Sequence, residues 1–215
     1  NAAEKVDHGE QEEKKLPLRV LCATLSTLSM AVVYYFLSRT CNSLGTAQAA
    51  IHAKVYTLFL TTVYITGGLM TVTETKGYAF KFAHPDFSLY RRQNINRAIV
   101  IGSVMAIAYI IPSLLIWNYS IQAMHTNLFP VLLISLLLQP PTTLLWALLA
   151  LLRSQGMFGR LLVIEIASMI IFVVAINIVP YTDLAWIVWL IFAGYFIIRI
   201  VLAWLLNFIG TVNTT

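Results

Sequence analysis

Six long apolar segments, separated by short polar connections, make up most of this 215-residue chain. The predicted spans cover residues 18–38, 50–73, 98–117, 128–152, 161–179 and 184–209. Each has about the 20 apolar residues that an α-helix needs to cross a bilayer core. The apolar residues are continuous and do not alternate, and isolated strands cannot satisfy their backbone in lipid. The pattern predicts an all-α, polytopic integral membrane protein with a six-helix domain over residues 18–210.

The segments outside the spans are short. Residues 1–17 form a polar N-terminal tail, residues 74–97 form the one substantial loop, and residues 211–215 form a C-terminal tail. With 59% hydrophobic and only 11% charged residues, the chain cannot cover a water-exposed surface. The net charge of +5 lies beside the apolar spans, so we expect anionic lipid as a partner and no nucleic acid.

The basic residues are distributed unevenly between the two sides of the predicted bundle. One side holds Lys5, Lys14, Lys15, Arg19, Lys76, Lys81, Arg91, Arg92, Arg97, Arg153 and Arg160. The opposite side holds only Arg39 and Lys54. Since basic residues concentrate in the non-translocated loops, both termini are predicted to lie on the inner side, in the cytoplasm or in the matrix or stroma of an organelle.

The type of membrane is left open by the sequence. The chain begins at Asn1, which fits either a processed mature form or a trimmed fragment. Removal of a transit peptide favours an organellar inner membrane. The sequon that begins at Asn118, in the short outer loop after the third span, instead predicts a possible glycan in a secretory-pathway or plasma membrane.

Arg199 lies near the middle of the sixth span, where a lone guanidinium costs about 3 kcal/mol or more. Glu165 enters the fifth span from the inner face, and the short hairpin at residues 180–183 makes these spans antiparallel neighbours. Counted from the inner ends, the two residues lie roughly 7 Å and 15 Å deep, a gap that the arginine can close. We expect an intramembrane charge pair, with a hydroxyl from Tyr195 nearby. It serves either as a structural ion pair or as a gate or relay.

The triplet Gln139-Pro140-Pro141 interrupts the fourth span. Two prolines remove two backbone donors, so the helix must kink. The break could form a ligand site at Gln139, as in transporters with broken helices. Its alternative is a packing kink whose backbone is satisfied by Ser135 or by hydroxyls that follow the prolines.

Two further patterns predict contacts and not chemistry. Small and hydroxylated residues share one helix face in each of the first two spans: Cys22, Ser26 and Ser29, then Thr57, Thr61, Tyr64 and Gly68. The loop at residues 74–97 interleaves aromatic residues with Lys76, Lys81, Arg91, Arg92 and Arg97, which predicts binding to anionic lipid or to a partner subunit.

No spacing of His8, His52, His84 and His125 fits a metal or haem site, so the sequence predicts solvated histidines, no metal and no cofactor. The favoured role is a non-catalytic structural or accessory subunit of a larger membrane complex. The alternative is a small transporter or channel component that uses Arg199, Glu165 and the kinked span. A third hypothesis is a lipid-modifying enzyme with Glu74, His84 and Asp86 at the inner interface.

Overall fold

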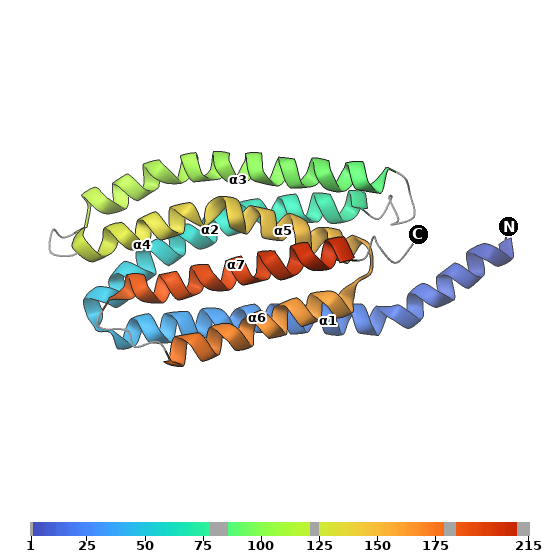
Figure 1. The fold of residues 1–215 in the computed structure, drawn as a ribbon, viewed down its shortest axis with the longest axis horizontal. Coiled ribbons are helices and arrows are strands. Elements are labelled where there is room, and N and C mark those ends of the chain that lie inside the picture. The colour runs from blue at the N-terminus through green and yellow to red at the C-terminus, as the bar shows by residue number, and fades with distance from the viewer. Residues whose placement is uncertain (1, 78–85, 121–124, 179–183, 210–215) are drawn as a thin grey trace.

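The computed structural model describes residues 2–77, 86–120, 125–178 and 184–209, which form seven α-helices and no strand (Figure 1). They are α1 (Ala2–Ser43), α2 (Thr46–Gly77), α3 (Phe87–Asn118), α4 (His125–Leu137), α5 (Gln139–Ser154), α6 (Phe158–Ile178) and α7 (Ala185–Ile209). Six helical segments are long and apolar enough to cross a membrane, with α4 and α5 together forming the fourth. The predicted all-helical class and the presence of six helical segments able to cross a membrane are therefore confirmed within these ranges.

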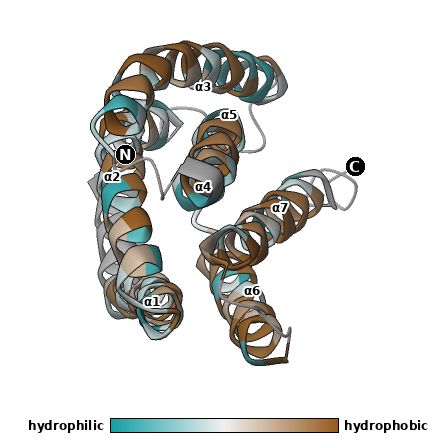
Figure 2. Cartoon of the chain, turned by 90° about the vertical axis from the view of Figure 1, so that its left-hand side faces the viewer, coloured by the Kyte–Doolittle hydropathy of each residue, from teal (hydrophilic) through white to brown (hydrophobic). Residues whose placement is uncertain are grey.

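The fourth span lies at the centre of the bundle. Viewed along the bundle, α4 and α5 lie between α2, α3 and α7, while α1 and α6 lie at the bottom, below α2 and α7 (Figure 2). Helix α5 packs mainly on α2, α3 and α7, and α1 packs mainly on α6. The fourth span is accordingly the most buried and α3 the least buried of the six.

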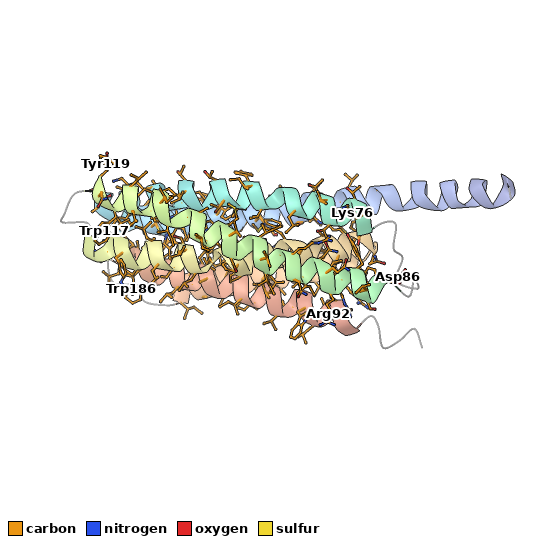
Figure 3. All side chains as sticks on the ribbon, turned by 90° about the horizontal axis from the view of Figure 1, so that it is seen from above. Lys76, Asp86, Arg92, Trp117, Tyr119 and Trp186 are labelled. Carbon is orange, nitrogen blue, oxygen red and sulfur yellow. The ribbon has the colours of Figure 1, made fainter. Side chains whose placement is uncertain are left out.

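The two ends of the bundle differ in composition. Lys76, Asp86 and Arg92 lie at one end, and Trp117, Tyr119 and Trp186 lie at the other (Figure 3). Helix α1 begins and α7 ends at the same end, the one with the charged residues (Figure 1). Basic residues at one end of a long apolar bundle, and aromatic residues where the bundle meets water, are typical of a protein that crosses a bilayer.

Aromatic residues fix the position of α7 against α2. Phe59 of α2 packs edge-on against Trp189, Phe192 and Phe196 of α7, with ring centroids 5.9, 5.8 and 6.0 Å away. Edge-to-face pairs at this separation are favourable beyond the area they bury. Since residues three and four apart share a helix face, this contact also carries Arg199 into the interior.

Two predicted segments differ from the structure. Helix α1 starts at Ala2 and includes Pro17, so residues 2–17 of the predicted tail continue the first helix beyond the bundle (Figure 1). The reason is its content of Ala, Glu, Gln and Lys, all strong helix formers. The tail at residues 211–215 lies outside the described residues.

The predicted loop at residues 74–97 is also wrong in extent. Helix α2 continues to Gly77 and α3 already begins at Phe87. Tyr90, Asn94 and Ala98 are buried one turn apart along the start of α3. The hydroxyl of Tyr90 donates to the Thr73 carbonyl of α2 over 2.7 Å. The inward face of the first turns of α3 is therefore packed against α2, which stabilises this polar segment as a helix.

Candidate functional site

The two formally charged side chains that are buried among the described residues, those of Glu165 and Arg199, form an ion pair between α6 and α7. Nη2 of Arg199 contacts Oε1 of Glu165, and the exposed fractions of the two side chains are 0% and 1%. The two residues come from antiparallel neighbours, as the sequence predicts. Because each charge is removed from solvent and from lipid, the pair stabilises the bundle only while both partners are present.

Residues from α1 complete the surroundings of this pair. Ser29 donates to Oε2 of Glu165 over 3.1 Å, and the sulfur of Met30 accepts from Nη1 of Arg199 over 2.8 Å. The hydroxyl of Tyr195 donates to the same sulfur over 3.1 Å, and the guanidinium carbon lies 5.1 Å from the Tyr195 ring centroid. We call Ser29, Met30, Glu165, Tyr195 and Arg199 the ion-pair cluster. It joins α1, α6 and α7.

One donor in the cluster lacks a partner. Nε of Arg199 is buried and makes no hydrogen bond in the structure, and Nη1 bonds to a thioether, which is a weak acceptor. The guanidinium therefore uses only part of its donor capacity. The sequence identified Arg199, Glu165 and Tyr195. Ser29 was visible only as part of a small-residue stripe, and no pattern pointed to Met30.

The fourth span is interrupted where the prolines are. Helix α4 ends at Leu137 and α5 begins at Gln139, with Leu138 between them. The amide of Gln139 is buried and donates to the Ser135 carbonyl over 3.1 Å, while Thr143 donates to the Gln139 carbonyl over 3.0 Å. The amide donor and the backbone carbonyl of Gln139 are thus used within the span, while the buried hydroxyl of Thr142 makes no hydrogen bond in the structure.

Helix α3 approaches the break closely. A Cβ added to Gly102 would lie 2.6 Å from Cα of Pro140 and 3.2 Å from the Thr143 side chain. Tyr109, two turns further along α3, donates to the Ser135 hydroxyl over 2.8 Å. These contacts are those of a tight helix crossing, in which a small residue admits a neighbouring backbone.

The predicted lipid-binding cations divide into two groups. Lys76, Arg92 and Arg97 are exposed at the charged end of the bundle. Arg91 instead donates to the Asn207 carbonyl in the last turn of α7 over 3.3 Å, a position where a cation also stabilises the helix dipole. Lys81 lies outside the described residues.

Asn118 is exposed and is the last residue of α3. Ser120, the third residue of the sequon, is buried, donates to the Ile116 carbonyl over 2.5 Å and accepts from Lys54 over 3.1 Å. An open groove of about 410 Å³ lies nearby between α3 and α4. It is lined by Ile110, Ser113, Leu114, Trp117, Phe129, Leu132, Leu133 and Leu136. None of these residues belongs to the ion-pair cluster, so the groove does not lead to the buried charges.

His52 is not solvated, contrary to the prediction. It is buried in α2, its Nε2 lies 3.1 Å from the Ser38 hydroxyl, and its ring stacks on Tyr56 at 5.1 Å. The predicted second span begins at residue 50, so its own boundaries already placed His52 inside. The structure contains no group of three or more metal-ligating side chains within its described ranges.

The described residues include two of the three members of the enzyme hypothesis. Glu74 is half-buried near the end of α2, and Asp86 is exposed just before α3. His84 lies outside the described residues.

The fold defines a class, a multi-pass helical membrane protein. No protein-family model matches the chain, and no curated protein or solved structure is significantly similar to it.

Proposed function

We propose that this chain is a non-catalytic structural subunit of a larger membrane complex, packing through its transmembrane helices and contacting anionic lipid at its basic end. The observation that carries the proposal is the ion-pair cluster. Its two charges pair with each other inside one subunit, and three helices supply its side chains. A pair closed in this way holds helices together and leaves no net charge for a solute to neutralise.

The broken fourth span supports the same role. In transporters, broken helices present free backbone groups to a substrate near the bilayer midplane. Here the Gln139 amide bonds to its own helix, and Gly102 packs directly against Pro140. The described pocket lies on the outside of the bundle and is apolar. These features favour packing over transport.

For orientation, we propose that both termini lie in the cytoplasm, matrix or stroma. The exposed cations Lys76, Arg92 and Arg97 would then face the leaflet that is richer in anionic lipid. Attachment of a fluorophore or protease site at each terminus, tested in sealed vesicles, should report the same side for both. Opposite sides would contradict the proposed orientation.

The role is tested with a variant that removes both charges without leaving either unpaired. In the double variant Arg199→Met with Glu165→Leu, apolar side chains replace the pair, which is often neutral for stability. We expect the same proteins to co-purify with this variant and with the wild type after gentle detergent extraction. Its matched control, Arg199→Met alone, should lose them, because Glu165 is left buried and unpaired. If no other protein co-purifies with the wild type, the proposal is contradicted.

A transporter or channel component is the second candidate, and the unpartnered Nε of Arg199 favours it. A guanidinium with unused donors near the centre of a membrane can bind a passing anion, and a neighbouring carboxylate can carry a proton. Proteoliposomes with chloride and proton indicators distinguish the two roles. Flux that is present in the wild type and absent in the folded double variant would replace the structural proposal with this one.

A further inference from the structure

A stripe of hydroxylated and small residues runs along the outside of α2. It consists of Thr57, Thr61, Tyr64, Gly68, Thr71 and Thr75, and we call it the α2 stripe. Successive members are separated by four, three, four, three and four residues. This is the spacing of the a and d positions of a heptad, which keeps one seam of a helix facing a partner helix. The sequence pattern therefore predicts that a helix lies along this face.

No helix among the described residues covers the α2 stripe. All six of its members are exposed. The inward face of α2 is a different one, formed by buried residues such as Val55, Thr62, Thr66 and Thr73. In a membrane protein the outward face is surrounded by lipid, where apolar side chains are expected. A polar seam on that face is unexplained by the fold of one chain.

Tyr64 is the member of the α2 stripe whose exposure to lipid costs the most free energy. Its side chain is 77% exposed, near the midpoint of the 32-residue helix. Tyrosines that face lipid normally lie at the membrane interface, where water binds the hydroxyl. At the midpoint, that hydroxyl has no water, and no side chain of the described chain bonds to it. A donor in hydrocarbon without an acceptor is unfavourable, so this face favours a protein partner.

The stripe also carries the matching acceptors. The hydroxyls of Thr57 and Thr61 donate to the backbone of their own helix, to the Ala53 and Thr57 carbonyls, each over 2.9 Å. Their protons are used, while the lone pairs of each oxygen stay available on the outward face. Two turns beyond Thr61, Gly68 leaves open space, since a Cβ added there would meet nothing within 4 Å. Small residues of this kind allow two helices to approach closely.

We infer that the α2 stripe is a homodimer interface, in which the α2 helices of two copies pack in parallel. Both copies have the same orientation in the membrane, so the two-fold axis runs along the membrane normal and residues of equal depth meet. A helical side chain leans toward the N-terminus, which directs the Tyr64 hydroxyl of one copy toward the Thr61 and Thr57 oxygens of the other. The face bears both a donor and its acceptors and no formal charge. A second copy therefore complements it.

This inference deepens the proposed role as a helix-packing subunit by naming one partner, a second copy of the chain. It uses none of the residues of the ion-pair cluster. The two can therefore fail independently, and the experiments below separate them.

Cysteine crosslinking in lipid vesicles tests the geometry. Both native cysteines are buried, and they are replaced by alanine to give a background without thiols. In this background, Gly68→Cys should form a disulfide-linked dimer under mild oxidation. The matched control is Val100→Cys on the exposed face of α3. It lies at a similar depth, because Asn94 of α3 bonds to Thr73 of α2 and the two helices are antiparallel. The control should stay monomeric, and equal crosslinking at both positions would overturn the inference.

The strength of the dimer is measured by single-molecule photobleaching as the protein is diluted into lipid. Tyr64→Phe removes only the hydroxyl, but it does so in both copies, so the symmetric dimer loses two interhelical hydrogen bonds and should weaken about ten- to two-hundredfold. Gly68→Ile should weaken it more, because the branched side chain holds the helices apart. Tyr35→Phe, an exposed tyrosine on α1, is the control and should change nothing. A wild-type chain that is monomeric at every dilution would contradict the homodimer.

The same variants distinguish this inference from the proposed function. If Gly68→Ile is monomeric but still co-purifies with other membrane proteins, both conclusions stand. If the wild type is monomeric while other proteins co-purify, only the homodimer is wrong. If it dimerises but nothing else co-purifies, only the subunit of a larger complex is wrong.

Discussion

The two halves of this bundle hold their helices together by different means. In the half formed by α1, α6 and α7, the interior contains a guanidinium and a carboxylate. In the half formed by α2, α3, α4 and α5, the buried polar residues that the structure describes are hydroxyls, amides and one imidazole. There the helices meet through Gly102 at Pro140 and through neutral hydrogen bonds such as that of Tyr109.

The difference teaches how each half can fail. The contribution of a buried ion pair to stability depends on both partners. When one partner is substituted, the remaining charge keeps its full desolvation cost. Neutral hydrogen bonds in a membrane contribute little each, and a close backbone contact depends on the absence of a side chain. We therefore expect large and rescuable effects in the first half, and smaller effects set by side-chain volume in the second.

The largest effect is expected from Arg199→Met. It should lower the free energy of unfolding by about 3–5 kcal/mol, because Glu165 remains buried without a counter-ion. The measurement is denaturant-induced unfolding in mixed micelles, followed by tryptophan fluorescence. Adding Glu165→Leu should restore most of the stability. A double variant as unstable as the single variant would mean that the charges matter for more than their pairing. It would contradict the proposed difference between the two halves.

Gly102→Ala tests the uncharged half. Its new Cβ would lie 2.6 Å from Cα of Pro140, and the backbone of the broken span would have to shift. Overpacking of this kind should cost about 1–3 kcal/mol. Gly194→Ala in α7 is the matched control, since open space surrounds that position. It should be neutral or stabilise the helix by up to about 1 kcal/mol, and a similar loss at both glycines would refute the close crossing.

Tyr109→Phe should have a smaller effect, because it removes one neutral hydrogen bond to Ser135 and keeps the ring. The expected loss of unfolding free energy is about 0.5–1.5 kcal/mol. The exposed Tyr35 offers the control Tyr35→Phe, for which no loss is expected. Loss above that of Arg199→Met would reverse the order of the two halves.

Arg91→Gln should have the smallest effect on stability. It tests the contact between the two halves, since Arg91 reaches from α3 to the Asn207 carbonyl in α7. Loss of a cation at a helix C-terminus costs about 0.3–1 kcal/mol. Faster hydrogen exchange should be confined to the last turn of α7. The adjacent, exposed Arg92 provides the control Arg92→Gln, which should leave that turn unchanged.

Parts of the candidate site could be predicted because membrane burial restricts where polar residues occur. An arginine in the middle of an apolar run requires a counter-ion, and Glu165 in the neighbouring span was the obvious one. Two consecutive prolines require a helix break. Neither argument depends on how the helices pack.

Other parts of the fold and of the candidate site could not be predicted from the sequence. The stripe of Cys22, Ser26 and Ser29 and the α2 stripe have similar spacing, yet the first is buried against the bundle and the second faces outward. Periodicity gives the face on which residues lie but not the direction in which that face points. The contact of Met30 with Arg199 and the approach of Gly102 to Pro140 likewise join residues far apart in the chain.

The sequence by itself determined the solvent of this protein, the number of its spans and the identity of its costly polar groups. These follow from local composition, because about 20 consecutive apolar residues are stable in lipid whatever their neighbours are. Only the tertiary structure decided that the break in the fourth span is filled by its own side chains, that Arg91 caps α7, and that a polar stripe of α2 points away from the bundle. Those outcomes depend on helix rotation and crossing, which side-chain packing fixes after the helices have formed.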